Sequence, residues 1–136
     1  MADVQEIRLV IRNQSRGRKL ASQISAPIKL WPWEKRASAL KGASMLVNAT
    51  SLGMTGFPPL EIELSFLPPE AVVNDIVYVP LRTTLLKMAE ARGNVIVDGL
   101  GMLIHQAKAG FASWFGIEPE VTLELKEFLI SSLERN

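Results

Sequence analysis

Apolar residues in this chain of 136 residues fall into short runs, and stretches with helical spacing separate them. The runs are nearly continuous rather than alternating, which is typical of strands covered on both faces in a parallel sheet. They predict five β-strands, at residues 6–11 ("EIRLVI"), 27–31 ("PIKLW"), 44–48 ("SMLVN"), 71–80 ("AVVNDIVYVP") and 94–97 ("NVIV").

Helix signals follow each predicted strand. Ser15 is expected to cap a helix that runs to about Ser25 and carries Leu20, Ala21 and Ile24 on one face. Thr83 is expected to cap another helix, which Gly93 ends. The other helices are expected over residues 33–40, over residues 102–115, and from Pro119 onward.

Strands that alternate with helices predict an α/β fold, here a partial Rossmann-like, doubly wound parallel sheet of about five strands. The length predicts a single domain over residues 1–136. Ligands of such sheets bind beyond the carboxyl ends of the strands. The candidate site is therefore made of "NQSRGRK", "NATSLGM", "YVPLRT" and "DGLGM".

Composition excludes several classes of function. The net charge of +1 favours neither a nucleic acid nor a membrane surface as partner. The chain has no Cys and one His, His105, so cysteine chemistry and His-rich metal sites are not expected. No run is long enough to span a bilayer and no signal peptide is recognisable, so we expect a cytoplasmic protein.

The sequence "DGLGMLI" places Gly99 and Gly101 between a strand and a helix, as in a dinucleotide phosphate loop. A third small residue should fall at Ile104, where helix and strand pack closely. No acidic residue ends a second strand about 20 residues further on. The phosphate-loop interpretation is therefore not favoured.

Four motifs occur in order at sensible spacing: "NATSLGM" (residues 48–54), "DIVYVP" (75–80), "TTLLKMA" (83–89) and "DGLGMLIHQA" (98–107). Together they closely resemble the C-terminal, NADP-binding half of shikimate dehydrogenase. That family reduces 3-dehydroshikimate to shikimate with NADPH, in a cleft between two domains. The resemblance therefore implies NADP as cofactor and shikimate as the small-molecule partner.

The resemblance also implies the site residues. The adenosine 2′-phosphate would lie near Asn13, Gln14, Ser15 and Arg18, and Thr50 and Ser51 would lie near the bound cofactor. Ile76, Gly99 and Met102 would lie at the nicotinamide end, where a side chain at Gly99 would obstruct the ring. Tyr78 and Gln106 would contact the substrate.

The chain departs from the family in three respects. The catalytic Lys–Asp pair of the N-terminal domain is not present, so no turnover is expected from this chain alone. The first Rossmann strand and its glycine-rich turn are not present before Glu6, which should separate the first two strands from the other three. Gln14 stands where the family often has Arg, so Arg16, Arg18 and Lys19 would have to supply the charge.

The open strand edges favour a homodimer formed by strand pairing or swapping. Alternatives remain: a non-catalytic α/β oligomerisation or binding module, and a quinate-oxidising variant. Asn48 is expected to hold its own loop and Asp75 to fix backbone rather than carry protons. His105 is expected at the surface or in packing.

Overall fold

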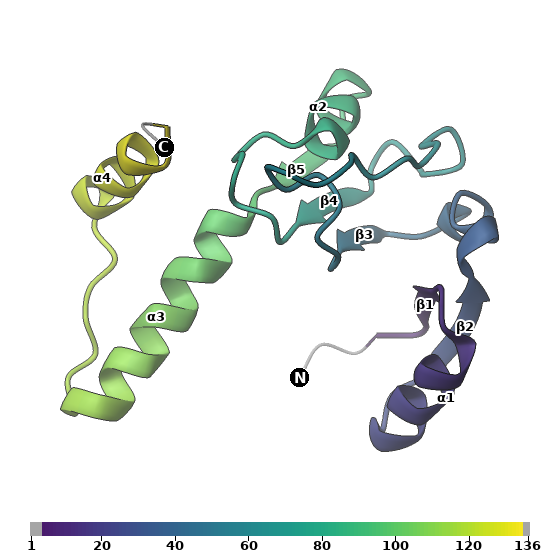
Figure 1. Cartoon of the computed structure of the whole chain (residues 1–136), viewed down its shortest axis with the longest axis horizontal. Coiled ribbons are helices and arrows are strands. Elements are labelled where there is room, and N and C mark those ends of the chain that lie inside the picture. Colours follow the sequence, from purple (N-terminus) through teal and green to yellow (C-terminus); the bar gives the residue numbers. More distant parts are fainter. Residues whose placement is uncertain (1–3, 135–136) are drawn as a thin grey trace. The chain divides into compact units, whose positions relative to one another are not determined.

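The chain folds as an α/β protein in which helices follow most of the parallel strands, whereas a long loop without a helix connects residue 48 to residue 72 (Figure 1). The computed structural model describes residues 4–134. It divides into two compact units: unit 1 runs to Ala43 and includes Ile62–Pro68, and unit 2 comprises Ser44–Glu61 and the residues from Pro69 onward. The predicted fold class is confirmed. The described strands form one sheet of two strands and one of three, and the first two are separated from the rest as expected.

Unit 1 is built on two parallel strands, β1 (Ile7–Ile11) and β2 (Ile28–Pro32), with helix α1 (Gln14–Gln23) packed on them. The helix approaches the sheet through Gly17, the residue of α1 that is buried. Leu20, Ala21 and Ile24 were expected on one face of this helix. Helix α1 ends at Gln23, so Ile24 lies beyond it, and Leu20 and Ile24 are 42% and 44% exposed.

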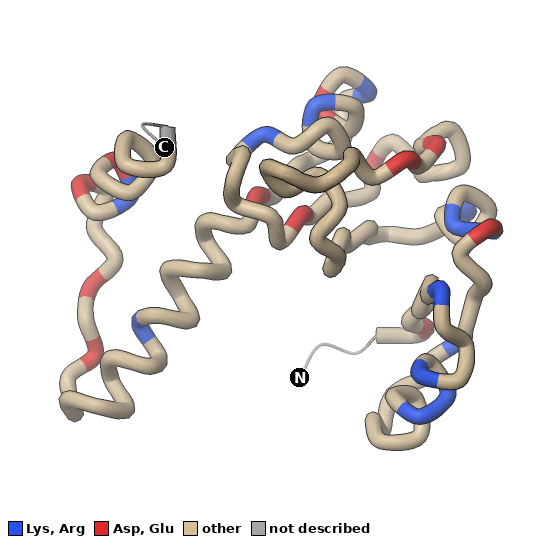
Figure 2. The backbone as a smooth tube through the Cα atoms, viewed as in Figure 1, with Lys and Arg blue, Asp and Glu red and all other residues tan. Residues whose placement is uncertain are grey.

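The first turn of α1 is capped by Asn13, not by Ser15 as predicted. The Asn13 side chain accepts a hydrogen bond from the backbone N–H of Arg16 at 3.0 Å. Lys and Arg residues are frequent along this helix (Figure 2). Since the cap lies two residues earlier than expected, the helix begins immediately after the turn that ends β1.

Beyond β2 the chain forms two short 3₁₀ helices, η1 (Trp33–Lys35) and η2 (Ser38–Leu40), instead of the single helix predicted there. The guanidinium of Arg8 holds this segment against β1. It donates hydrogen bonds to the carbonyl of Ala39 at 2.8 Å and to that of Lys41 at 2.6 Å.

Unit 2 contains the parallel strands β3 (Met45–Asn48), β4 (Val72–Asp75) and β5 (Val95–Val97), in that spatial order. Helix α2 (Thr84–Ala91) packs on β4 and β5. The buried residues of this layer include Val73, Leu85, Leu86 and Ala89. Helix α2 thus covers one face of the sheet and leads the chain back to β5.

The other face of this sheet is exposed. Residues that are paired in register share a face, and the exposed set is Met45 and Val47 on β3 with Val95 and Val97 on β5, each between 43% and 62% exposed. The expectation that both faces are covered is wrong for this sheet in unit 2. These four side chains are apolar, and between Val47 and Val97 the face carries the polar Asn74, whose amide donates a hydrogen bond to the carbonyl of Val97 at 3.2 Å.

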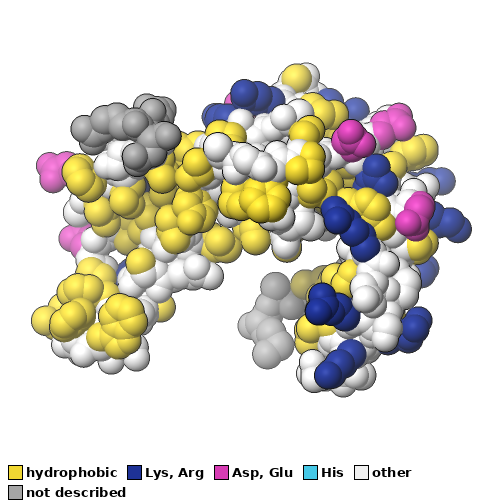
Figure 3. Space-filling model, viewed as in Figure 1, with side chains coloured by type: hydrophobic (Ala, Val, Ile, Leu, Met, Phe, Trp, Pro, Cys, Tyr) yellow, Lys and Arg dark blue, Asp and Glu magenta, His cyan; other side chains and the backbone are white. Residues whose placement is uncertain are grey.

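Two helices complete unit 2, α3 (Gly99–Phe115) and α4 (Leu123–Glu134). Helix α3 begins at Gly99 rather than at residue 102, and it ends at Gly116, which has a φ of 68°. Helix α4 begins after Thr122, whose hydroxyl accepts a hydrogen bond from Leu125 N at 3.2 Å, rather than at Pro119. Aromatic side chains at the end of α3 are exposed, and hydrophobic atoms are visible over this part of unit 2 (Figure 3). None of the helices in residues 4–134 has the length and apolar character needed to cross a bilayer.

Candidate functional site

A buried polar network joins the carboxyl ends of β3 and β4 to the start of α2. The Asp75 carboxylate is fully buried. One of its oxygens accepts hydrogen bonds from Asn48 Nδ2 at 3.0 Å and from Val77 N at 3.1 Å. The other accepts from Thr83 Oγ1 at 2.7 Å. Three donors therefore compensate for the cost of burying this carboxylate, and three segments are fixed relative to one another.

Thr83 and Asn48 extend the network into the backbone. The Thr83 hydroxyl oxygen accepts a hydrogen bond from Leu86 N at 3.3 Å, so it caps α2 as predicted. The Asn48 amide also donates to the carbonyl of Leu52 at 2.9 Å. Both expectations about strand-end polar residues are confirmed: Asn48 holds its own loop, and Asp75 fixes backbone.

The loop after β3 is ordered by Thr50. Its backbone N–H and its hydroxyl donate to Asn48 Oδ1 at 3.1 Å and 2.7 Å, and its hydroxyl oxygen accepts from Leu52 N at 3.1 Å. The hydroxyl proton is therefore used within the loop. Thr50 can still offer its methyl group and backbone to a ligand, while Ser51 beside it is exposed.

Backbone hydrogen bonds connect this loop with the segment after β4. Ile76 N donates to the carbonyl of Asn48 at 3.1 Å, and Thr55 N donates to the carbonyl of Val79 at 2.9 Å. Tyr78 lies between these two anchored points, and its side chain is 37% exposed. The loops thus hold the tyrosine from both sides and leave its ring accessible at the carboxyl edge of the sheet.

The N-terminus of α3 lies against the end of β4. Asp98 caps the helix by accepting a hydrogen bond from Leu100 N at 3.1 Å. A Cβ atom on Gly99 would lie 2.2 Å from the carbonyl oxygen of Ile76 and 2.8 Å from the carbonyl carbon of Val77. We had expected glycine here to leave room for a nicotinamide ring. The structure supplies another reason, namely the close approach of α3 to the backbone of β4.

Met102 and Gln106 lie one turn apart on α3, and both side chains are exposed. Leu100 and Ile104 on the same helix are buried. Thr50, Ser51, Ile76, Tyr78, Gly99 and Met102 therefore lie at the carboxyl edge of β3, β4 and β5, and Gln106 lies one turn further along α3. Unit 2 brings together the residues predicted for the nicotinamide and substrate end.

The residues predicted for the adenosine end lie in unit 1, at the carboxyl end of β1. Asn13 uses its side chain as the cap of α1. Gln14 Nε2 donates to the carbonyl of Ile11 at 2.9 Å and to that of Trp31 at 3.2 Å, so both of its amide protons bind backbone. Ser15 and Arg18 are exposed.

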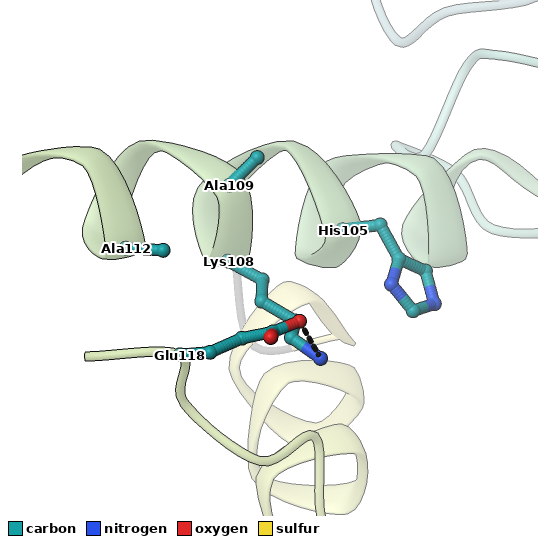
Figure 4. A pocket seen from close by; sticks show the side chains of 5 residues that line it. All are labelled: His105, Lys108, Ala109, Ala112 and Glu118. Atoms are coloured by element: carbon teal, nitrogen blue, oxygen red, sulfur yellow. Dashed lines mark ion pairs between the residues drawn. The ribbon is translucent and has the colours of Figure 1, made fainter. Parts of the chain in front are cut away.

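Unit 2 also has a surface hollow on α3. It is lined by His105, Lys108, Ala109, Ala112 and Glu118, and an ion pair of 2.9 Å joins Lys108 Nζ to Glu118 (Figure 4). The hydrogen bond from Lys108, assisted by its charge, lowers the pKa of Glu118 below the ordinary 4.5. His105 is exposed, as expected, and none of the predicted site residues lines the hollow.

One feature of the site was missed in the sequence. Thr83 was recognised only as a helix cap, and its hydrogen bond to Asp75 was not expected. The available signal was a carboxylate within an apolar run.

Solved structures with this fold define the class of protein. Quinate dehydrogenase from Corynebacterium glutamicum in complex with NAD matches with a TM-score of 0.85 and 32% identity, over 93% of this chain and 47% of that chain. Shikimate 5-dehydrogenase from Thermus thermophilus in complex with NADP(H) and shikimate matches with a TM-score of 0.71 and 28% identity, over 94% of this chain and 45% of that chain. The fold is thus that of a Rossmann-like dehydrogenase domain.

Sequence relatives specify the family. A family profile described as "Shikimate 5'-dehydrogenase C-terminal domain" matches residues 99–123. The curated shikimate dehydrogenase (NADP(+)) of Paramagnetospirillum magneticum is 52% identical over 130 residues, which are 96% of this chain and 47% of that protein. The chain belongs to the shikimate dehydrogenase family, in the region of its C-terminal domain, and it spans about half the length of the curated relatives it matches.

Proposed function

We propose that this chain is the cofactor-side domain of an NADP-dependent oxidoreductase that interconverts 3-dehydroshikimate and shikimate. The proposal rests on the arrangement at the carboxyl edge of unit 2. The hydrogen bonds among Asn48, Asp75 and Thr83 fix the segment after β4 that contains Tyr78, and the start of α3 lies against the same segment. Family membership supports the choice of substrate and cofactor.

The residues present fit a dinucleotide of this kind. At the carboxyl edge of unit 2, Met102 offers an exposed apolar thioether, and the Tyr78 hydroxyl has no hydrogen-bond partner within residues 4–134. At the carboxyl edge of unit 1, Ser15 and Arg18 offer a hydroxyl and a cation, and no acidic residue stands in the first turn of α1. When bound, the nicotinamide supplies or accepts the hydride.

The side chains have positioning roles in this proposal. The hydroxyl of Tyr78 and the amide of Gln106 hydrogen-bond the substrate and fix its orientation, which is the proximity contribution to catalysis. Met102 limits the access of water to the reacting atoms. The family resemblance assigns the proton-handling Lys–Asp pair to the other domain, so we expect residues 1–136 alone to bind without turnover.

Binding measurements test the proposal. Titration with NADPH should give a micromolar Kd, and shikimate should bind to the chain saturated with NADP. Tyr78→Phe should weaken shikimate roughly tenfold, the cost of one lost hydrogen bond, without changing the affinity for NADPH. Lys87→Gln, on the exposed side of α2, is the control. Failure to bind NADPH at millimolar concentration would refute the proposal.

A second candidate is a non-catalytic module that assembles with a second copy. The exposed apolar face formed by Met45, Val47, Val95 and Val97 favours it, since such faces mark interaction sites. Sedimentation analysis tests this homodimer, and a monomer at all concentrations excludes it. A quinate-oxidising variant is tested by offering quinate in place of shikimate. The cytoplasmic location remains a prediction from the sequence.

A further inference from the structure

The carboxylate of Asp75 is held in one orientation by side chains from two other segments. Asn48, its partner in register on β3, donates to Oδ1 at 3.0 Å, and Thr83, the cap of α2, donates to Oδ2 at 2.7 Å. Asp75 is fully buried, so bulk solvent cannot replace either donor. Because the two donors bind different oxygens, the carboxylate cannot rotate without breaking a buried hydrogen bond.

The oriented carboxylate sets the turn of the chain after β4. Its Oδ1 atom also accepts a hydrogen bond from Val77 N at 3.1 Å, two residues further on, which is the pattern of an Asx turn. Val77 is 5% exposed, whereas its neighbour Tyr78 is 37% exposed. The turn at Asp75 therefore buries the valine and leaves the ring of the tyrosine accessible.

The peptide unit that joins Ile76 to Val77 also lies against the start of α3. A Cβ atom on Gly99 would lie 2.2 Å from the carbonyl oxygen of Ile76 and 2.6 Å from its carbonyl carbon. Helix α3 carries Gln106, the other residue proposed to bind the substrate, further along its length. A shift of this peptide unit would therefore move Tyr78 relative to Gln106.

The hydroxyl of Tyr78 has no hydrogen-bond partner within residues 4–134, so its position depends on the backbone of its own segment. The backbone bonds on either side of it, at Ile76 N and at the carbonyl of Val79, join neutral amides. The bond from Val77 N goes to a carboxylate, and charge-assisted bonds of this kind are roughly twice as strong. Its acceptor is a side chain, so substitution of Asp75 can weaken this bond and leave the backbone bonds in place.

We propose that Asp75 is a positioning residue for the substrate, and that it acts by holding the backbone of Val77 so that the hydroxyl of Tyr78 has one position. Asn48 and Thr83 keep its carboxylate oriented for this role. The inference rests on the proposed function, because it assumes that Tyr78 binds the substrate. It assigns part of the substrate affinity to a side chain that does not touch the substrate. Because Asp75 acts through Tyr78, a change in its hydrogen bonds can weaken substrate binding at most as much as removal of the tyrosine hydroxyl does.

A double-mutant cycle tests the inference, with the whole chain saturated with NADP and shikimate as the ligand in a calorimetric titration. Thr83→Val removes one of the two donors that orient the carboxylate. It should weaken shikimate roughly three- to tenfold, within the roughly tenfold loss expected for Tyr78→Phe. In the Tyr78→Phe background, Thr83→Val should change the affinity by less than about twofold, because the hydroxyl that is being positioned is gone. Thr83→Ser keeps the donor and should restore binding. Leu85→Ala is the matched control, since it leaves a cavity under α2 without removing a hydrogen bond, and it should not depend on the residue at position 78.

Amide hydrogen exchange, followed by NMR, gives a readout that needs no ligand. Asp75→Asn keeps the shape of the side chain but has one acceptor oxygen in place of two. In this variant and in Thr83→Val, the amide of Val77 should exchange roughly tenfold faster relative to that of Val73 in β4. Leu85→Ala should speed the exchange of both amides alike. If Thr83→Val does not fold, Asp75→Asn takes its place in the binding cycle.

Each remaining outcome decides against the inference. Additive losses from Thr83→Val and Tyr78→Phe, or an unchanged exchange of Val77 relative to Val73, mean that these hydrogen bonds stabilise the fold without positioning the tyrosine. If Thr83→Val binds shikimate as tightly as the unaltered chain while Tyr78→Phe does not, the proposed function stands and Asp75 has no part in substrate binding. If Tyr78→Phe itself loses no affinity, or if the chain binds no shikimate, the proposed contact of Tyr78 fails first and the inference fails with it.

Discussion

Replacing Gly99 by Ala tests the contact on which the candidate site depends, the seat of α3 on the end of β4. The new Cβ would lie 2.2 Å from the Ile76 oxygen, where an ordinary contact is at least 3.4 Å, so the first turn of α3 must move by about 1 Å. The obstructing atoms are backbone and cannot rotate away. Overpacking of this kind lowers the free energy of unfolding by about 3 kcal/mol, and the higher helix propensity of alanine offsets up to about 1 kcal/mol of that loss.

We therefore expect Gly99→Ala to lower the free energy of unfolding by about 2 kcal/mol. In urea, with a typical slope of about 2 kcal/mol per molar, the midpoint should fall by about 1 M. Gly101→Ala is the matched control, because its Cβ would meet nothing within 4 Å and should stabilise α3 by up to about 1 kcal/mol. Equal midpoints for the two variants, measured by circular dichroism at 222 nm, would refute the argument from close approach.

Three further predictions concern the hydrogen bonds of Asp75, the surface ion pair of Lys108 with Glu118, and the packing of α1 at Gly17. Thr83→Val should lower the free energy of unfolding by about 2–4 kcal/mol in urea, because it leaves an Asp75 oxygen buried without its donor and removes the cap of α2, whereas Thr83→Ser should recover most of the loss. Lys108→Gln should raise the pKa of Glu118 toward 4.5, as followed by NMR titration of its carboxyl group. The Lys108–Glu118 pair stabilises the fold at pH values above the ordinary pKa of 4.5, and it loses this effect as the pH falls through the lowered pKa of Glu118. A titration of Glu118 that is the same in Lys108→Gln would contradict the assignment. Gly17→Ala should cost only about 0–2 kcal/mol in the same urea assay, because its Cβ would meet side-chain methyl groups at 2.9 and 3.1 Å and not backbone; a cost above that of Gly99→Ala would overturn this comparison.

The order of strands and helices could be predicted because each has a local signal. Thr83 and Gly93 bound α2 as expected, since a cap and a positive φ depend on neighbouring residues alone. The start of α3 could not be predicted in this way. Glycine has a low helix propensity, so the sequence around Gly99 favours a loop, but the contact with β4 makes glycine the residue that fits there.

The position of the predicted residues at the strand ends could be predicted, but the hydrogen bonds around them could not. The order of motifs placed Tyr78 and Met102 at one edge of a parallel sheet, and the structure agrees. The bonds of Asp75 to Asn48 and to Thr83 span 27 and 8 residues. They depend on the register of β3 with β4, which is a property of the folded sheet. For the same reason, the glutamine amide at position 14 could not be assigned to backbone until the register of β1 with β2 was known.

On the exposed sheet face of unit 2, the hydrophobic pattern of the sequence does not correspond to burial. Continuous apolar strands are selected when both faces are covered, and α2 covers only one face of β3, β4 and β5. Met45, Val47, Val95 and Val97 therefore carry a sequence pattern for burial without being buried in this unit. The same pattern therefore has two outcomes in this chain: it predicts the parallel strands of unit 2 correctly, and it predicts the covering of their second face wrongly.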